Sequence, residues 1–234
     1  MILRSTIEKI RLNSNAIKII AMFTMAIDHI GFIIFDNMKI FRIIGRLSFP
    51  LFAFMIAEGC RYTRNKLNYF LRIFILAVIC QIFFEIFYDG ETLNTLLTFS
   101  MSILLIYLFQ YAKDNYNSMY WTAFFTALVL VMLICEVVPE LVVSYRYKID
   151  YRFPGVLMPL AFYIPEQKYK KLIFACFFMM WLCFIYKNHQ YWCFMALIPL
   201  SLYNGKKGKL HMKYFVYLFY PLHFVLIYAI SLFC

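Results

Sequence analysis

Long apolar stretches follow one another along almost the whole of this chain, and each is close to the length that crosses a lipid bilayer. A hydrocarbon core of about 30 Å needs about 20 helical residues. Apolar residues make up 64% of the 234 positions and charged residues only 15%, which leaves too little polar surface to cover a water-soluble fold. The sequence therefore predicts an all-α fold, a polytopic integral membrane helical bundle.

The spacing of these stretches predicts nine crossings, with eight as the alternative. The sixth stretch contains several charged residues as well as Pro154 and Pro159. We expect its first half to be re-entrant or interfacial and only the part from Tyr151 to be buried. The eighth stretch is short for a full crossing. The predicted crossings are Ala16–Phe35, Ile40–Cys60, Leu67–Tyr88, Thr92–Ala112, Met119–Val138, Leu141–Ile164, Leu172–Tyr186, Tyr191–Tyr203 and Tyr214–Phe233.

The Lys and Arg residues predict the orientation, because they are retained on the cytoplasmic side of short loops. With the N-terminus in the cytoplasm, most of the 23 Lys and Arg residues fall inside, and the acidic turn Asp89–Glu91 faces outward. We attribute the net charge of +11 mainly to this retention of Lys and Arg at the cytoplasmic side. Binding of an anionic ligand is the second explanation. We expect no nucleic acid partner, because no basic domain lies outside the membrane.

The remaining composition predicts a single transmembrane domain over residues 1–234, since no repeat or linker divides the chain. Seven cysteines lie mostly within the crossings, and none is spaced as C-x-x-C. They are expected to be small core residues, with neither a disulfide framework nor a metal site. The oligomeric state is left open by the sequence.

Ionisable side chains inside the crossings are the strongest functional signal, because a charge at the bilayer centre costs about 3 kcal/mol or more. Asp28 and His29 fall in the first crossing, and Arg42 and Arg46 fall in the second. Counted from the outer helix ends, His29 and Arg46 are each about 9 Å deep, so they share a level. Both arginines lie on one stripe with Gly45, a small residue that permits close helix approach. Asp28 and Arg46 are expected to neutralise one another.

Two interpretations of this group remain open. In one, an ion pair locks two helices together and His29 is merely hydrogen-bonded. In the other, His29 relays a proton or acts as a general base beside a carboxylate. His223 lies near the middle of the last crossing, and Asn94 and Asp150 lie near outer helix ends, so these three side chains are expected to point to a similar region.

Glu58, Arg61 and Arg64 stand at the inner end of the second crossing. They are explained either as a helix end whose long side chains reach the interface or as a mouth for an anionic donor that enters from the cytosol.

Several blocks of the sequence resemble the TraX family of bacterial membrane proteins, and together they cover nearly the whole chain. The G-R-x-x-F-P and E-G-x-x-x-T-R-N patterns within them are specific, whereas D-H-x-G alone is weak. The blocks are Lys18–Met22 through Asp28–Gly31, Arg42–Phe54, Glu58–Asn65, Leu93–Asn94 with Leu97–Thr98, Asp150–Tyr151 with Gly155–Leu157, and Phe219–His223.

This resemblance implies a multi-pass protein of the bacterial cytoplasmic membrane that transfers an acetyl group from cytosolic acetyl-CoA to an envelope-side amine or hydroxyl. The acceptor is a pilin N-terminus, a peptide or a saccharide. The resemblance also implies that His29 is the base or itself takes the acetyl group, supported by Asp28 and Arg46, with His223 in the same cavity. Because CoA is a multiply charged anion, its phosphates are expected to be bound at the cytoplasmic face by Arg61, Arg64 and Arg72 or by the Lys206–Lys213 cluster. The residues expected to bind substrate are Asn94, Asp150 and Glu58.

Two other classes of function stay open. A proton-coupled small-molecule transporter would also place Asp28, His29, Arg46 and His223 in a cavity. A structural subunit of a pilus or envelope assembly would not depend on His29.

Overall fold

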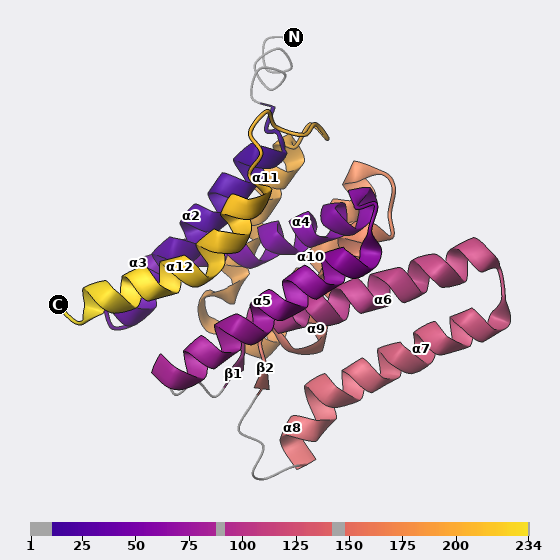
Figure 1. Ribbon diagram of the computed structural model, residues 1–234, viewed down its shortest axis with the longest axis horizontal. Helices are drawn as coiled ribbons and strands as arrows, with labels where there is room; N and C mark the ends of the chain where they lie inside the picture. Colours follow the sequence, from indigo (N-terminus) through magenta and orange to yellow (C-terminus); the bar gives the residue numbers. More distant parts are fainter. Residues whose placement is uncertain (1–10, 88–91, 142–147, 234) are drawn as a thin grey trace. The chain divides into compact units, whose positions relative to one another are not determined.

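The computed structural model describes residues 11–87, 92–141 and 148–233 (Figure 1). The predicted turn Asp89–Glu91 lies outside these residues. The chain divides into two compact units. Unit 1 comprises Met1–Met55 with Gln167–Cys234, and unit 2 comprises Ile56–Glu166.

Seven helical segments among the described residues are long and apolar enough to cross a membrane, which confirms the predicted class of multi-pass helical protein. Each agrees with a predicted crossing to within a few residues. The segments are α2 (Ser14–Ile33), α3 (Lys39–Gly45) continued by α4 (Ser48–Tyr62), α5 (Lys66–Phe87), α6 (Thr95–Asn115), α7 (Ser118–Met132) continued by the π-helix η1 (Leu133–Val137) and α8 (Val138–Leu141), α10 (Lys168–Tyr186) and α12 (Lys213–Ser231).

Asparagine side chains begin four of these helices. Asn13 accepts a hydrogen bond from the Ala16 amide, Asn65 from the Asn68 amide, Asn94 from the Leu96 amide and Asn117 from the Met119 amide. A side-chain oxygen at this position satisfies an amide that has no partner within the helix. Polar residues between apolar stretches therefore set where the helices start.

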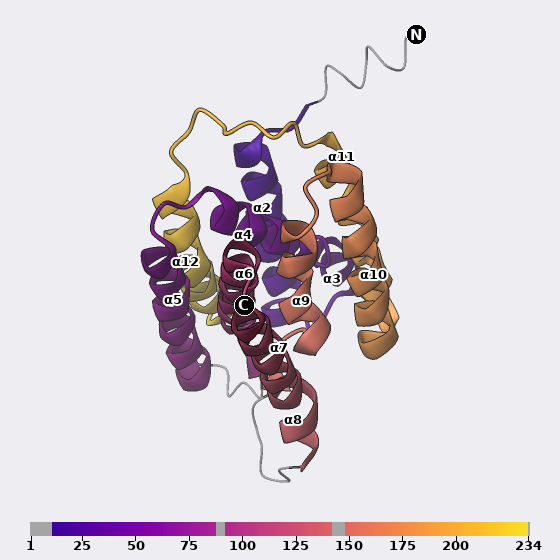
Figure 2. The same cartoon turned by 90° about the vertical axis from the view of Figure 1, so that its right-hand side faces the viewer.

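The eighth predicted crossing, Tyr191–Tyr203, is present as a return segment of unit 1 rather than as one regular helix. It consists of the 3₁₀-helix η2 (Asn188–Ala196) and the short α11 (Leu197–Leu202), and both pack against α10 (Figure 2). At about 2.0 Å per residue in the first part and 1.5 Å in the second, the segment extends about 27 Å, near the thickness of the hydrocarbon core. It looked short in the sequence because a 3₁₀-helix rises further per residue.

The ammonium group of Lys168 confirms that this segment runs antiparallel to α10. Lys168, the first residue of α10, donates hydrogen bonds to the carbonyls of Ser201 and Tyr203 at the end of α11, the second over 2.7 Å. The start of α10 and the end of α11 consequently lie on the same side of unit 1.

The sixth predicted crossing, Leu141–Ile164, contains the helix α9 (Arg152–Tyr163). Strand β2 (Lys148–Ile149) pairs in parallel with β1 (Thr92–Leu93), and α9 follows β2 as α6 follows β1. Most of the first half, predicted to be irregular from its charged residues and the prolines, falls on residues 142–147, which lie outside the described residues. With 12 residues, α9 alone is shorter than the other crossings.

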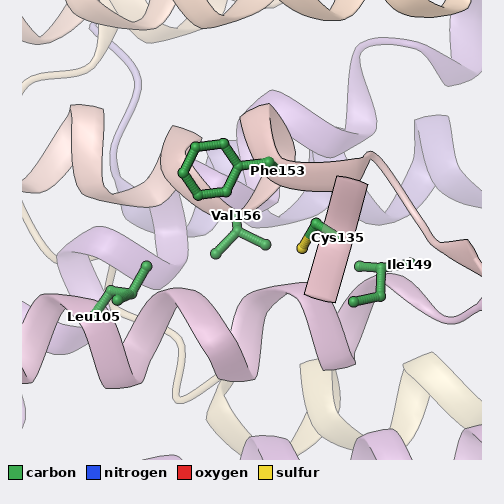
Figure 3. Close-up of a cluster of buried hydrophobic side chains, with 5 residues drawn as sticks. All are labelled: Leu105, Cys135, Ile149, Phe153 and Val156. Atoms are coloured by element: carbon green, nitrogen blue, oxygen red, sulfur yellow. The ribbon is translucent and has the colours of Figure 1, made fainter. Parts of the chain in front are cut away.

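Helix α9 is fixed in unit 2 by apolar packing and by polar caps. Its residues Phe153 and Val156 are buried in a cluster with Leu105, Cys135 and Ile149 (Figure 3). The carboxylate of Glu136, in the π-helix η1, accepts a hydrogen bond of 3.0 Å from the Phe153 amide and forms an ion pair of 3.0 Å with Arg152. A carboxylate at a helix N-terminus is favourable because the helix dipole is positive there.

Basic residues gather at one end of unit 1, as the predicted orientation requires. The backbones of Leu12 and Tyr203 lie side by side, Ser14 donates to the carbonyl of Lys206, and Asn15 donates to the carbonyl of Leu210. The start of α2, the end of α11 and the start of α12 therefore meet at this end. The basic residues nearby in the chain are Arg11, Lys168, Lys206, Lys207, Lys209 and Lys213.

Candidate active site

Two glycines bring α2 and α3 into close contact within unit 1. A Cβ atom at Gly31 would overlap Phe41, and one at Gly45 would overlap the carboxylate of Asp28. The close approach predicted at Gly45 is thus confirmed. The side chain of Asp28 rests directly on the backbone of the second predicted crossing.

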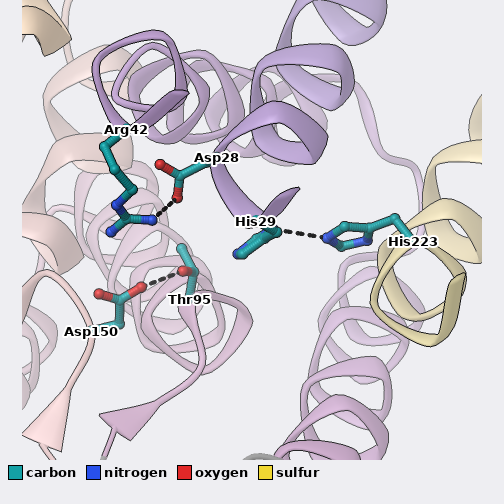
Figure 4. A network of polar contacts seen from close by, with 6 residues as sticks. All are labelled: Asp28, His29, Arg42, Thr95, Asp150 and His223. Atoms are coloured by element: carbon teal, nitrogen blue, oxygen red, sulfur yellow. Dashed lines mark hydrogen bonds and ion pairs between the residues drawn. The ribbon is translucent and has the colours of Figure 1, made fainter. Parts of the chain in front are cut away.

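The residue that forms an ion pair with Asp28 is Arg42. Its Nη1 donates a hydrogen bond of 2.7 Å to Oδ2 of Asp28, and the two side chains are only 21% and 16% exposed (Figure 4). The guanidinium also lies over the ring of Phe32, 5.4 Å from its centroid. Within lipid, such pairing offsets much of the cost of each charge.

The sequence had predicted Arg46 as this partner, and the break between α3 and α4 explains the difference. Helix α3 ends at Gly45, and Arg46 caps it before α4 begins at Ser48. Because Gly45 is seated on Asp28, the side chain that reaches the carboxylate comes from one turn earlier. Arg46 contributes a second positive charge near the same carboxylate.

His29 and His223, from the first and last predicted crossings, are in direct contact. Nδ1 of His29 lies 3.0 Å from Nε2 of His223, and Nδ1 of His223 lies 3.0 Å from the carbonyl oxygen of Phe219 (Figure 4). His223 is buried. The structure therefore brings together two histidines that are 194 positions apart in the sequence.

Aromatic rings enclose the histidine pair. Phe219 stacks on His223 with ring centroids 5.1 Å apart and planes only 7° from parallel. The ring centroid of Phe224 lies 4.4 Å from that of His29 and 4.0 Å from that of His223, and Tyr220 contacts His223 edge-on. Such surroundings exclude water and hold both imidazoles in fixed orientations.

Asn94, a predicted substrate-binding residue, uses its side chain within the fold of unit 2. Its oxygen accepts from the amides of Leu96 and Leu97, and its nitrogen donates to the carbonyl of Ala77 and to Gln81. These bonds hold α5 against the start of α6. Gln81, inside the third predicted crossing, accepts hydrogen bonds from the side chain and the backbone amide of Asn94. The sequence did not predict this role.

Asp150, also predicted to bind substrate, is hydrogen-bonded to two residues of α6. Its carboxylate accepts from Thr95 (Figure 4), and its carbonyl accepts from Thr98 over 2.7 Å. Two of the sequence blocks that resemble the TraX family, Leu97–Thr98 and Asp150–Tyr151, are therefore joined by a hydrogen bond. Asn94 and Asp150 belong to unit 2, whereas His29 and His223 belong to unit 1.

Unit 2 contains a pocket of about 110 Å³ built around Arg61. Arg61 donates a hydrogen bond of 2.6 Å to the carbonyl of Tyr163 and lies 3.6 Å from Glu58, the third predicted substrate residue. The buried side-chain oxygen of Gln110 has no hydrogen-bond partner among the residues that the structure describes. The lining residues are Arg61, Phe109, Gln110, Lys113, Asp114, Tyr163, Ile164 and Glu166.

Arg64 and Arg72, predicted with Arg61 to bind the donor, are exposed and lie outside the set that lines this pocket. Lys113, Gln110 and Tyr163 were missed in the sequence because they belong to helices predicted as ordinary crossings. Among the described residues, no group of three His, Cys, Asp or Glu side chains is placed to hold a metal ion.

These features define a polytopic membrane protein whose helices enclose an ion pair and a histidine pair. The chain belongs to the TraX family: the family described as TraX protein matches residues 13–231, which confirms the resemblance drawn from the sequence blocks.

Two relatives illustrate the family. An uncharacterized protein of Rickettsia prowazekii (strain Madrid E) is 28% identical over 189 residues, covering 80% of this chain and 68% of its own. A protein of Dichelobacter nodosus, named as the probable fimbrial assembly protein FimC of serogroup H1, is 25% identical and covers 93% of this chain and 95% of its own. No solved structure matches the chain.

Proposed function

We propose that this protein is a membrane-embedded acyltransferase of the bacterial cytoplasmic membrane, which transfers an acetyl group from cytosolic acetyl-CoA to an envelope-side amine or hydroxyl. The contact between His29 and His223 inside a helical bundle carries this proposal most directly. A buried, oriented imidazole is the usual means by which enzymes remove a proton from an attacking nucleophile. The ion pair between Asp28 and Arg42 already joins α2 to α3, so a purely structural role for this site would not need the histidine pair.

The acceptor is proposed to be a pilin-like N-terminus, a peptide or a saccharide. Membership of the TraX family supports an envelope or pilus substrate, as does the relative named as a fimbrial assembly protein. The proposed site also lies in membrane-spanning helices, where an acceptor from the outer side and a donor from the inner side can meet.

In the proposed reaction, the amine nitrogen or hydroxyl oxygen of the acceptor forms a bond to the acetyl carbon. His29 takes up the proton that this nitrogen or oxygen loses. The bond between carbon and sulfur then breaks with its electron pair on the CoA sulfur, and His29 returns the proton to that sulfur. Asp28 with Arg42 supplies a fixed dipole beside His29, and Arg46 adds positive charge for the oxygen that becomes negative during transfer.

The pocket around Arg61 is proposed to receive part of the CoA donor. Its residues fit such a group in three ways. Arg61 and Lys113 supply cations for the phosphate oxygens of CoA. Phe109 and Tyr163 supply aromatic faces against which its adenine base can stack. The buried side-chain oxygen of Gln110 can accept a hydrogen bond from an amide or amino group of the donor. Asp114 and Glu166 at the same pocket limit its positive charge, so the proposed recognition is directional rather than purely electrostatic.

A proton-coupled transporter is the second candidate, favoured by the same hydrogen-bonded histidines. Two imidazoles in contact can pass a proton across a membrane interior, as buried ionisable residues do in transporters. The two candidates differ in whether acetyl-CoA is consumed.

Transfer from radiolabelled acetyl-CoA by the purified full chain tests the proposal. The comparison uses wild type, His29→Ala and the matched control His211→Ala, whose histidine is exposed in the basic segment. We expect label transfer or hydrolysis by wild type and the control, and a loss of about 100-fold or more in His29→Ala.

Folded wild type that neither binds nor consumes acetyl-CoA would overturn the proposal. Uptake of a small molecule by proteoliposomes that depends on a proton gradient and not on acetyl-CoA would then establish the transporter.

A further inference from the structure

The hydrogen-bond partners of the two histidines fix where their protons lie. A backbone carbonyl only accepts hydrogen bonds, so Nδ1 of His223, facing the carbonyl of Phe219, must carry a proton. In neutral His223 the other nitrogen, Nε2, is then an acceptor, and Nδ1 of His29 must donate to it. Neutral His29 consequently has its lone pair on Nε2, at the other side of the ring from His223.

One added proton can settle in either of two places. It can remain on Nε2 of His29, which makes His29 the cation. Alternatively, the Nδ1 proton of His29 can cross the 3.0 Å contact to Nε2 of His223. His29 is then neutral again with its proton on Nε2, and His223 is the cation with both N–H groups hydrogen-bonded.

The surroundings favour the charge on His223. The ring of Phe219 stacks on its imidazole, and aromatic faces attract cations, whereas Phe224 contacts both histidines alike. The positive charge of Arg42 opposes a cation on His29, where one backbone hydrogen bond, to Met25, favours it; His223 has two such backbone partners, Phe219 and Tyr220. The charged residues on the helices packed around the pair are Lys18 and Asp28 on α2, Lys39 and Arg42 on α3 with Arg46 at its end, and Lys213 at the start of α12.

We propose that His223 is the second proton carrier of the site: it sets the lone pair of His29 on Nε2 and receives the Nδ1 proton when His29 is protonated. This inference rests on the acyl transfer proposed above. In the forward step, the acceptor proton moves to Nε2 of His29 while the Nδ1 proton moves to Nε2 of His223. In the return step, His29 gives its Nε2 proton to the sulfur of CoA and recovers its Nδ1 proton from His223. Both histidines end as they began.

Magnetic resonance of isotope-labelled histidine nitrogens in the full chain, held in lipid nanodiscs, tests the relay without requiring turnover. The chain has 4 histidines, and the variants His189→Asn and His211→Asn identify the other two signals. At neutral pH we expect both His29 and His223 to carry their proton on Nδ1. When the pair takes up one proton on acidification, His223 should show two protonated nitrogens and His29 should switch its proton to Nε2.

A doubly protonated His29 beside a neutral His223 after acidification would overturn the relay, as would a His29 that already carries its only proton on Nε2 at neutral pH, before the pair has taken up a proton. Because this readout is independent of catalysis, failure of acyl transfer and failure of the relay are distinguishable.

Kinetics of two His223 variants separate proton transfer from simple positioning. In His223→Gln, the side-chain oxygen can still accept from Nδ1 of His29 but cannot take its proton, whereas His223→Phe removes the acceptor. The relay predicts that His223→Gln lowers kcat by about 100-fold, with the KM for acetyl-CoA changed by less than about threefold. A kcat near that of wild type in folded His223→Gln would overturn the relay. The nitrogen spectrum of wild type decides the matter if the variants do not fold.

Discussion

The Nη1 atom of Arg42 lies 2.7 Å from Oδ2 of Asp28, and this ion pair connects the first two predicted crossings one residue away from His29. The pair joins α2 to α3 within unit 1. Arg42 and Arg46, which the sequence predicted to lie on one helix stripe, therefore have different roles: Arg42 forms the ion pair, and Arg46 caps α3.

Replacing Arg42 with Gln should lower the free energy of unfolding by about 1.5–3 kcal/mol, because it leaves the carboxylate of Asp28 in a poorly solvated site without its charged hydrogen bond. Unfolding in detergent, followed by circular dichroism, measures the change. The double variant Asp28→Asn with Arg42→Gln should cost less than the sum of the two single variants, since the interaction is lost only once. Additive effects would contradict a direct pair.

Replacing Gly45 with Ala should lower the free energy of unfolding by about 1–3 kcal/mol, because the new Cβ would overlap the carboxylate of Asp28 and force α2 and α3 apart. The neighbouring Ile44→Ala is the control, as Ile44 is 36% exposed and its truncation adds no atom to the contact. Thermal unfolding of both variants checks this expectation. A Gly45→Ala variant as stable as wild type would show that the contact can relax without cost.

How far the sequence could predict this site depends on the range of each interaction. Helix lengths and their asparagine starts follow from local patterns, so the regular crossings were predicted closely. The histidine contact was anticipated only as a shared region, since nothing local links His29 to His223. The partner of Asp28 was predicted wrongly because the stripe assumed one continuous helix, whereas α3 ends at Gly45. The length of η2 was likewise not predicted, because the predicted crossings assumed the rise per residue of an α-helix, which is smaller than that of a 3₁₀-helix.

Asn94 should prove more important for stability than an ordinary helix cap. Asn94→Ala removes a cap and also leaves the carbonyl of Ala77 without its side-chain donor, whereas Asn117→Ala removes an exposed cap alone. We expect about 1 kcal/mol for Asn117→Ala and roughly 2 kcal/mol more for Asn94→Ala. Paired unfolding curves make the comparison. Equal losses would mean that the bonds from Asn94 to α5 contribute little.

Substitution of Arg61 should weaken acetyl-CoA binding if the pocket around it receives the donor. Arg61→Lys keeps the charge but loses the planar donor group that lies 5.1 Å from the ring of Tyr163. We expect about a tenfold increase in Kd, equivalent to about 1.4 kcal/mol, measured by isothermal titration on the full chain in detergent. Lys148→Gln, an exposed residue of β2 away from the pocket, is the matched control and should bind as wild type does. Unchanged binding in Arg61→Lys, with a loss in Arg64→Gln or Arg72→Gln, would move the donor site to the exposed arginines.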